Sequence, residues 1–221
     1  MFAHGTGHPI RDTLTAMNLS FFIKGLIFGF SIAAPVGPIG ILCIRRSLAG
    51  GWQAGLLTGM GAATADAVYG CMAAFGLAGV TGVLVGQQLW IQLIGGLFLC
   101  WLGLRILLSH GTTPAAAKAP GSTAGYLSAL LLTLTNPMTI LSFAAVFAGM
   151  GLGLNSAGPT TAAWLVAGVF SGSMAWWVIL ASISGRLRDG ISSAVMGWIN
   201  RISGLVLTAF GLVAIANRLS G

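Results

Sequence analysis

The sequence predicts an all-α integral membrane protein with six transmembrane helices, built as two inverted three-helix repeats in which helices 1 and 4 are broken. Three observations lead to this prediction: a lipid-like composition, apolar runs of membrane-spanning length, and a similarity between the two halves. Of 221 residues, 56% are hydrophobic and only 6% are charged. About a quarter of the residues of a soluble domain carry a charge. The mean hydropathy of +0.94 agrees with lipid as the solvent.

The distribution of charge argues against a nucleic-acid partner. The net charge is +7 and the isoelectric point is near 10.4, but the basic residues stand mostly singly or in pairs between apolar runs. Nucleic-acid binders gather them on one face, whereas membrane proteins use them as cytoplasmic anchors. The 3 cysteines lie in or beside apolar runs without metal-type spacing. They are expected to be small apolar fillers, and no metal or other cofactor is expected.

The apolar runs predict the helices in order. A membrane-spanning helix needs about 20 mostly apolar residues, and the segments that meet this length are 19–43, 53–80, 84–108, 125–150, 160–183 and 198–217. Residues 1–18 are expected to form a polar N-terminal tail without the apolar core of a signal peptide; a native start at Met17 is the alternative. The first repeat then covers 19–109 and the second 125–221. A linker at 110–124, rich in Pro, Gly, Ala and Thr, joins them.

Basic residues near the span ends predict the orientation. They lie after spans 1, 3 and 5, as Arg45 and Arg46, Arg105 and Lys118, and Arg186 and Arg188. The loops after spans 2 and 4 contain neither Lys nor Arg. Because cytoplasmic loops carry the excess of positive charge, the linker is predicted to be cytoplasmic and both termini to lie outside.

Internal similarity predicts two copies of one unit. The segment WIQLIGGLFLCWLGL from Trp90 matches WINRISGLVLTAFGL from Trp198 at eight of fifteen positions, including the tryptophans and two glycines. GLLTGMGA from Gly55 and GVFSGSMA from Gly168 share a Gly-x-x-x-Gly pattern. Three helices per copy is an odd number, so the second copy enters the membrane from the opposite side. Transporters built in this way place their site between the copies.

Both copies begin with a span that contains proline. PVGPIG at 35–40 has two prolines and two glycines, and TNPMT at 135–139 places Asn136 before Pro137. Proline lacks the amide hydrogen that a helix interior needs. Broken backbone at membrane depth requires protein or water to satisfy the freed groups. A packed kink is the simpler interpretation of one break, but breaks in the first helices of both halves favour a binding site.

Asp66 is the only acid within a predicted span. A charged carboxylate at the bilayer centre costs about 2.5–3.5 kcal/mol, so a functional role toward a proton or an ammonium group is the first interpretation. At a rise of about 1.5 Å per residue, Asp66, Pro35 and Asn136 are expected at a similar depth. A structural pairing with Asn136, a threonine or loose amides is the alternative. Trp176 and Trp177 are weaker candidates for lining a cavity, because aromatic residues in membrane helices are more often packing or interface anchors.

Three motifs resemble the lysine-exporter (LysE/RhtB-type) family of amino-acid translocators: APVGPIG at 34–40, GLLTGMGAATADAVYG at 55–70 and LTNPMT at 134–139. With the spacing of the spans, the resemblance extends over nearly the whole chain from Met17. It implies a secondary transporter of the bacterial inner membrane that exports amino acids or related small zwitterionic metabolites and draws on the proton gradient. The family's commoner first motif is Pro-Gly-Pro, and Val36 makes the motif one residue longer here.

The substrate-binding residues expected from the breaks and the resemblance are Pro35, Gly37, Pro38, Asp66, Thr135, Asn136, Pro137 and Thr139, with Asp66 also as the proton-coupling group. Half-helix amides would hold a substrate carboxylate, and Asp66 its ammonium group or the coupling proton. No nucleophile–base pair lies within the spans, so no enzymatic activity is expected. The alternatives are an exporter of a cation or another polar metabolite, and a non-transporting membrane assembly subunit. The expected partners are the small-molecule substrate and membrane lipids, and the Gly-x-x-x-Gly motifs permit a homodimer.

Overall fold

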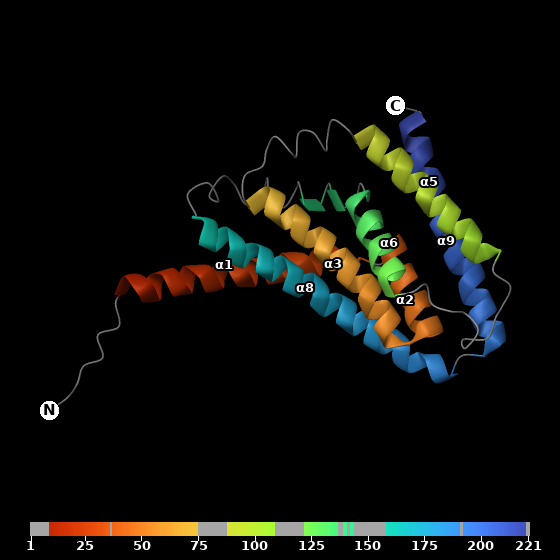
Figure 1. Cartoon of the computed structure of the whole chain (residues 1–221), viewed down its shortest axis with the longest axis horizontal. Coiled ribbons are helices and arrows are strands. Elements are labelled where there is room, and N and C mark those ends of the chain that lie inside the picture. The colour runs from red at the N-terminus through yellow and green to blue at the C-terminus, as the bar shows by residue number, and fades with distance from the viewer. Residues whose placement is uncertain are drawn as a thin grey trace.

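A computed structural model of the chain describes residues 9–35, 37–74, 88–108, 122–136, 139–140, 142–143, 158–190 and 192–219. The elements within them are α1 (Pro9–Ala33), α2 (Pro38–Gly50), α3 (Trp52–Ala74), α5 (Gln88–Leu107), α6 (Ser122–Leu134), α8 (Pro159–Arg186), the short 3-10 helix η2 (Leu187–Gly190) and α9 (Ser193–Leu219). The prediction of an all-helical protein is confirmed for this part of the chain. Figure 1 shows α1, α8 and α3 beside one another, with α5 and α9 paired on the other side of the molecule.

The first predicted span, 19–43, consists of two helices separated by a short break. α1 ends at Ala33 and α2 begins at Pro38, with Gly37 in an extended conformation before it. Proline suits the first position of a helix, because its missing amide hydrogen is not needed there and its φ angle is already helical. α2 continues to Gly50, beyond the predicted end of the span.

The fourth predicted span, 125–150, is interrupted at its own proline motif. α6 ends at Leu134, Thr135 forms a turn, and residues 139–140 and 142–143 are helical. Pro137 lies outside the described residues. Proline disfavours a helical conformation for the residue before it, which explains why α6 ends ahead of Asn136.

Two helices extend into segments that were expected to lie outside the spans. α1 begins at Pro9, within the predicted tail 1–18, and α6 begins at Ser122, within the predicted linker 110–124. Both starts carry residues that are common where helices begin, a proline and a serine. Hydropathy locates the apolar part of a helix but not the polar turn that precedes it, so the predicted boundaries are late at both places.

Three described helical segments are long and apolar enough to cross a membrane: Thr15–Ala33, Pro159–Arg186 and Ala194–Val213. Two shorter apolar segments are Leu93–Leu107 and Thr123–Leu134. α3 is long enough, but Asp66 and its many small residues lower its hydropathy. Length and composition therefore support a helical membrane protein without establishing all of the predicted spans.

α1 packs along α8 through glycines on both helices. A Cβ atom added to Gly29 would overlap the backbone carbonyl of Val169, and one added to Gly172 would overlap that of Leu26. Small residues of this kind let two helix backbones approach closely in a membrane, where packing rather than the hydrophobic effect holds helices together. The crossing fixes the position of α8 relative to the end of α1, and therefore relative to the break before α2.

α5 and α9 form an antiparallel pair through a second set of glycines. A Cβ atom added to Gly103 would lie 2.7 Å from the carbonyl oxygen of Gly204, and one added to Gly211 would lie 2.6 Å from that of Gly96. In the sequence repeat, Gly96 is equivalent to Gly204, and Gly103 to Gly211. Gly103 of the first copy therefore contacts Gly204 of the second. The equivalent residues, Gly211 of the second copy and Gly96 of the first, make the same contact with the two copies exchanged.

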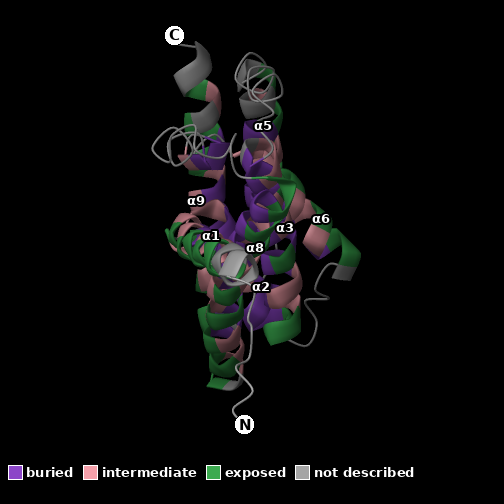
Figure 2. Cartoon of the chain, turned by 90° about the vertical axis from the view of Figure 1, so that its left-hand side faces the viewer, coloured by how far each residue is buried: buried purple, intermediate pink, exposed green. Residues whose placement is uncertain are grey.

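The largest buried cluster lies where α3 meets α2, α6 and α8. In Figure 2 the buried residues lie on the helix faces that point into the bundle, and the exposed residues lie on the outer faces. Several exposed residues are large and apolar, such as Trp90 at 61% and Trp198 at 63% exposure. Such faces would be costly in water, whereas lipid tails are as apolar as these side chains.

Candidate functional site

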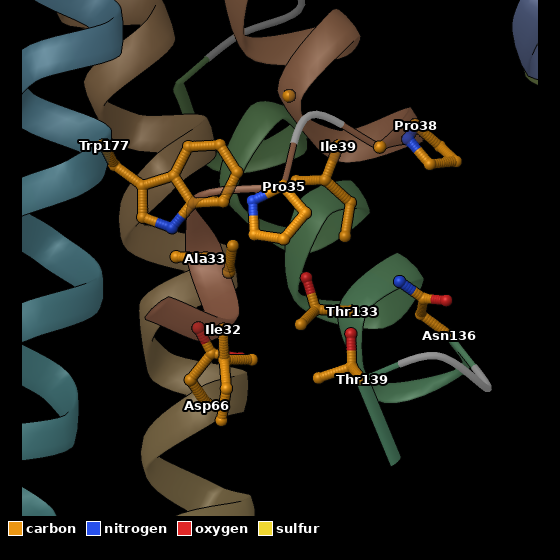
Figure 3. A pocket seen from close by; sticks show the side chains of 13 residues that line it. Ile32, Ala33, Pro35, Pro38, Ile39, Asp66, Thr133, Asn136, Thr139 and Trp177 are labelled. Atoms are coloured by element: carbon orange, nitrogen blue, oxygen red, sulfur yellow. The ribbon is translucent and has the colours of Figure 1, made fainter. Parts of the chain in front are cut away.

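A cavity lies at the break between α1 and α2 and is closed by α3, α6 and α8 (Figure 3). Its volume is about 50 Å³, and one ordered water needs about 10–15 Å³ of such space. It therefore has room for a few waters or a small polar solute. The described residues that line it are Ile32, Ala33, Pro35, Gly37, Pro38, Ile39, Gly40, Ala62, Asp66, Thr133, Asn136, Thr139 and Trp177. Asp66 is the one charged side chain in this lining.

Most of the residues predicted to bind substrate meet in this cavity, although they come from distant parts of the sequence. The lining includes Pro35, Gly37, Pro38, Asp66, Asn136 and Thr139. Thr135 is not in the lining: its hydroxyl donates to the carbonyl of Leu131 at 2.8 Å, and its side chain packs against Gly95 of α5. Pro137 lies outside the described residues, so its predicted role stays a prediction.

The first turn of α2 brings backbone amides to the cavity. Gly37 precedes the helix and has no side chain to cap it, and Pro38 has no amide hydrogen. The amide of Ile41 donates to the carbonyl of Gly37, four residues earlier, at 3.1 Å. The amides of Ile39 and Gly40 are therefore among those that a helix leaves unpaired at its beginning. They carry partial positive charge that favours an anionic group in the cavity.

Asp66 of α3 accepts a hydrogen bond from a serine on α8. The Ser173 hydroxyl donates to Asp66 Oδ2 at 2.7 Å, and the Trp177 indole Nε1 donates to Ser173 Oγ at 3.1 Å. All three side chains are buried, and Asp66 is only 3% exposed. A buried carboxylate is costly unless it is hydrogen-bonded, so this chain of bonds explains how α3 retains an acid inside the helix bundle.

Sequence reasoning missed Ser173 and gave Trp177 only a weak candidacy. Both lie on α8, one turn apart, in a segment whose Gly-x-x-x-Gly pattern indicated only helix packing. Thr133 of α6 is also in the lining, but its hydroxyl donates to the carbonyl of Ala129 at 2.8 Å. The contact between α3 and α8 is the signal that identifies Ser173, and it is absent from the sequence pattern.

Arg46 forms a second polar cluster, two turns along α2 from the cavity. Sequence analysis placed it in the loop after the first span, and the loop assignment is wrong, because α2 continues past Arg46 and buries it to 4% exposure. Its Nη1 donates to Thr58 Oγ1 of α3 at 3.0 Å and to the carbonyl of Gly125 of α6 at 2.9 Å. Its Nη2 donates to Ser128 Oγ of α6 at 2.7 Å. One guanidinium group therefore ties α2 to the helices on both of its sides.

An Arg46→Ala variant is expected to unfold at a clearly lower temperature than the wild type, because it removes a donor from three acceptors, two of them in buried hydrogen bonds. Hydrogen bonds to a charged group contribute about 1.5–3 kcal/mol each, and we expect a loss of about 3 kcal/mol in total after relaxation. Thermal unfolding in detergent, followed by tryptophan fluorescence, measures the effect. Arg201→Ala is the matched control, because Arg201 is exposed over the ring of Trp198. Equal midpoints for the two variants would contradict the structural role of Arg46.

In the described part of the chain, helices broken at a cavity, apolar outer faces and the buried Asp66 agree with a membrane translocator, and the family match places the chain in this class rather than among enzymes. The family model described as LysE type translocator matches residues 30–218, and the chain belongs to this family. This match confirms the resemblance drawn from the three sequence motifs.

Individual relatives cover most of the chain at low identity. A chemotactic transduction protein of Pseudomonas aeruginosa is 29% identical over 90% of this chain and 98% of its own length. The threonine efflux protein of Escherichia coli K12 is 29% identical over 62% of this chain and 70% of its own length. That of Salmonella typhimurium is 25% identical over 91% of this chain and all of its own. No solved structure matches the chain.

Proposed function

We propose that this protein exports amino acids or related small zwitterionic metabolites across the bacterial inner membrane, driven by the proton gradient. The observation that carries the proposal is the pairing of opposite charges across one small cavity: the Asp66 carboxyl group on α3 and the partial positive charge of the first turn of α2. A zwitterion has the complementary pair of charges on neighbouring carbon atoms. The names of the threonine efflux relatives support the same class of substrate.

In this proposal the substrate carboxylate binds the amides of Ile39 and Gly40, and its ammonium group binds Asp66. Amides at a helix start bind anions because they point outward with the positive end of the helix dipole. Asn136 and Thr139 line the cavity from the second half of the chain and add polar contacts. In Figure 3 they lie on the side opposite Trp177, with Pro35 between the two groups in this view. Asp66 also takes up the coupling proton when the substrate has left.

We further propose that the six predicted spans form two inverted three-helix repeats around this cavity, with both termini in the periplasm. The glycine contacts between α5 and α9 support this arrangement. When two copies are related by a two-fold axis, every contact from the first copy to the second is repeated from the second copy to the first, as these contacts are. Transport then proceeds by rocking one repeat against the other around the central site. A homodimer remains compatible with the exposed apolar faces of α5 and α9 and is a separate prediction.

A non-transporting role in a membrane assembly is the second candidate. It is favoured by one observation, the relative of similar length named a chemotactic transduction protein. In that case the cavity is a packing defect at the helix break, and the buried acid serves only the contact between α3 and α8.

Flux through the purified protein separates the two candidates. Proteoliposomes containing the full chain are loaded with radiolabelled threonine, and then with each of the other amino acids in turn. We expect faster efflux than from protein-free liposomes for at least one amino acid, a further increase under an imposed pH gradient, and loss of that increase with a protonophore. Efflux equal to that of protein-free liposomes for every amino acid would contradict the transport proposal and favour the assembly role.

A further inference from the structure

We propose that Ser173, held by Trp177, is a positioning residue that directs the Asp66 carboxyl group, so that Oδ2 is occupied and Oδ1 is presented to the cavity. The proposal rests on the proposed function, since it assigns the atom that receives the substrate ammonium group or the coupling proton. It is carried by the direction of two hydrogen bonds, from Trp177 Nε1 to Ser173 Oγ and from Ser173 Oγ to Asp66 Oδ2.

The chemistry of the three groups permits only one direction for this chain while Asp66 is ionised. An indole nitrogen can only donate, a carboxylate can only accept, and a serine hydroxyl has a single hydrogen to give. Because Trp177 donates to Ser173 Oγ at 3.1 Å, that oxygen acts as the acceptor of the first bond. The single hydroxyl hydrogen is donated to Asp66 Oδ2 at 2.7 Å. Oδ2 of the carboxylate therefore already accepts one hydrogen bond, and Oδ1 is the oxygen that receives a proton or an ammonium group.

Ser173 differs from the threonines in the middle of other helices, although Thr161 in the first turn of α8 also donates across an interface, to Asn18 Oδ1 of α1 at 3.1 Å. Hydroxyls in the middle of a helix commonly donate to the carbonyl one turn earlier. Within the described helices this is how threonines behave in α3, α6 and α9, namely Thr58, Thr64, Thr133, Thr135 and Thr208. Ser173 is fully buried and donates across the helix interface instead. Its hydroxyl is thus used on the acid of the neighbouring helix.

The position of Trp177 is fixed by the same interface. A Cβ atom added to Gly59 of α3 would overlap the Cβ atom of Trp177, so the tryptophan lies directly against the α3 backbone. Trp177 is 4% exposed and lines the cavity together with Asp66. Its indole nitrogen is directed at Ser173, while its ring forms part of the cavity wall. Within the part of the chain that the structure describes, Asp66 Oδ1 accepts no hydrogen bond, which leaves this atom to a solute.

The test compares Ser173→Ala, Ser173→Thr, Trp177→Phe and the double variant Ser173→Ala/Trp177→Phe with the wild type, as full-length protein in liposomes. Ser184→Ala is the matched control, because Ser184 is a buried serine of the same helix outside the cavity lining. We expect Ser173→Ala to lower amino-acid efflux about tenfold, the size of one lost hydrogen bond to a charged group. Trp177→Phe lowers it less. The double variant equals Ser173→Ala, because without the serine oxygen the indole has nothing to orient.

Two further measurements separate positioning from folding. Ser173→Thr keeps the hydroxyl and is expected to recover most of the efflux. Efflux is compared per amount of folded protein, because loss of the bond to the buried acid is also expected to lower the thermal midpoint of Ser173→Ala below that of Ser184→Ala. In infrared difference spectra between acidic and alkaline buffer, the carboxyl band that disappears in Asp66→Asn is expected to shift in Ser173→Ala and to return in Ser173→Thr.

The infrared result tests the hydrogen bond between Ser173 and Asp66 without requiring transport. If the wild type transports no amino acid, the proposed function is contradicted, but the hydrogen bond can still be tested. An unshifted Asp66 band in Ser173→Ala would overturn the inference. A shifted Asp66 band in Ser173→Ala together with wild-type efflux would also overturn it. The same holds if the efflux losses of the two single variants multiply in the double variant. Neither result agrees with a serine that acts through Asp66.

Discussion

An Asp66→Asn variant is expected to retain about a tenth or less of the wild-type efflux. Asparagine has nearly the same shape, so the packing of α3 against α8 is preserved, but its amide neither binds a proton nor attracts an ammonium group. Bonds between ionised groups and their partners are worth about 1.5–3 kcal/mol, and each 1.4 kcal/mol corresponds to a factor of ten. Efflux of a labelled amino acid from proteoliposomes under a pH gradient measures the effect.

The controls for Asp66→Asn use the other acids of the chain, which has 3 in total. Asp189→Asn, in η2 beyond the end of α8, makes the same chemical change and is expected to transport at the wild-type rate. Asp66→Glu keeps the charge but lengthens the side chain in a packed interface, so intermediate efflux is expected. Wild-type efflux by Asp66→Asn would exclude both proposed roles of the carboxyl group and leave Asp66 as a packing residue.

A Gly172→Ala variant is expected to be much less stable, and to yield much less folded protein, than a variant with a substitution at an exposed position. The added carbon atom would occupy the position of the Leu26 carbonyl oxygen, and backbone cannot move aside without separating α1 from α8. Overpacking of this kind costs about 1–3 kcal/mol and occasionally more. We expect a lower thermal midpoint in detergent and a smaller monodisperse fraction on size-exclusion chromatography.

Gly197→Ala is the matched control for this variant, because nothing lies within reach of the added carbon atom on α9. Alanine is favoured over glycine in a helix interior by about 1 kcal/mol, so an unchanged or slightly raised midpoint is expected. If Gly172→Ala and Gly197→Ala have the same thermal midpoint, the close approach of α1 and α8 does not contribute to stability in the way described.

Local chemistry explains why the helix breaks were predictable. Pro35 and Pro137 act on their own neighbourhoods, since proline removes one amide hydrogen and disfavours helix at the preceding residue. The observed ends of α1 at Ala33 and of α6 at Leu134 follow from that. Asp66 was also identifiable, because an acid within an apolar run is costly wherever the run is packed.

The side chains around the breaks were less predictable, because the break itself changes their direction. Thr135 and Thr139 flank the same proline and have the same chemistry. Thr135 belongs to the turn that ends α6 and packs toward α5, whereas Thr139 lies beyond the turn and faces the cavity. A helical period cannot be extrapolated across an interrupted backbone, so one of the two threonines was assigned to the site without lining it.

Residue types along the chain were sufficient to predict the class of this protein: an all-helical chain for a lipid environment, with proline breaks and one acid within an apolar run. Those properties depend on residue type and on near neighbours along the chain. Only the tertiary structure decided which groups complete the site. Ser173 reaches Asp66, and Arg46 reaches Thr58 and Ser128, through particular positions of α8, α3 and α6 against one another. A hydrogen bond between helices forms only over about 3 Å, and that precision comes from the packing of glycines between distant segments rather than from any local pattern.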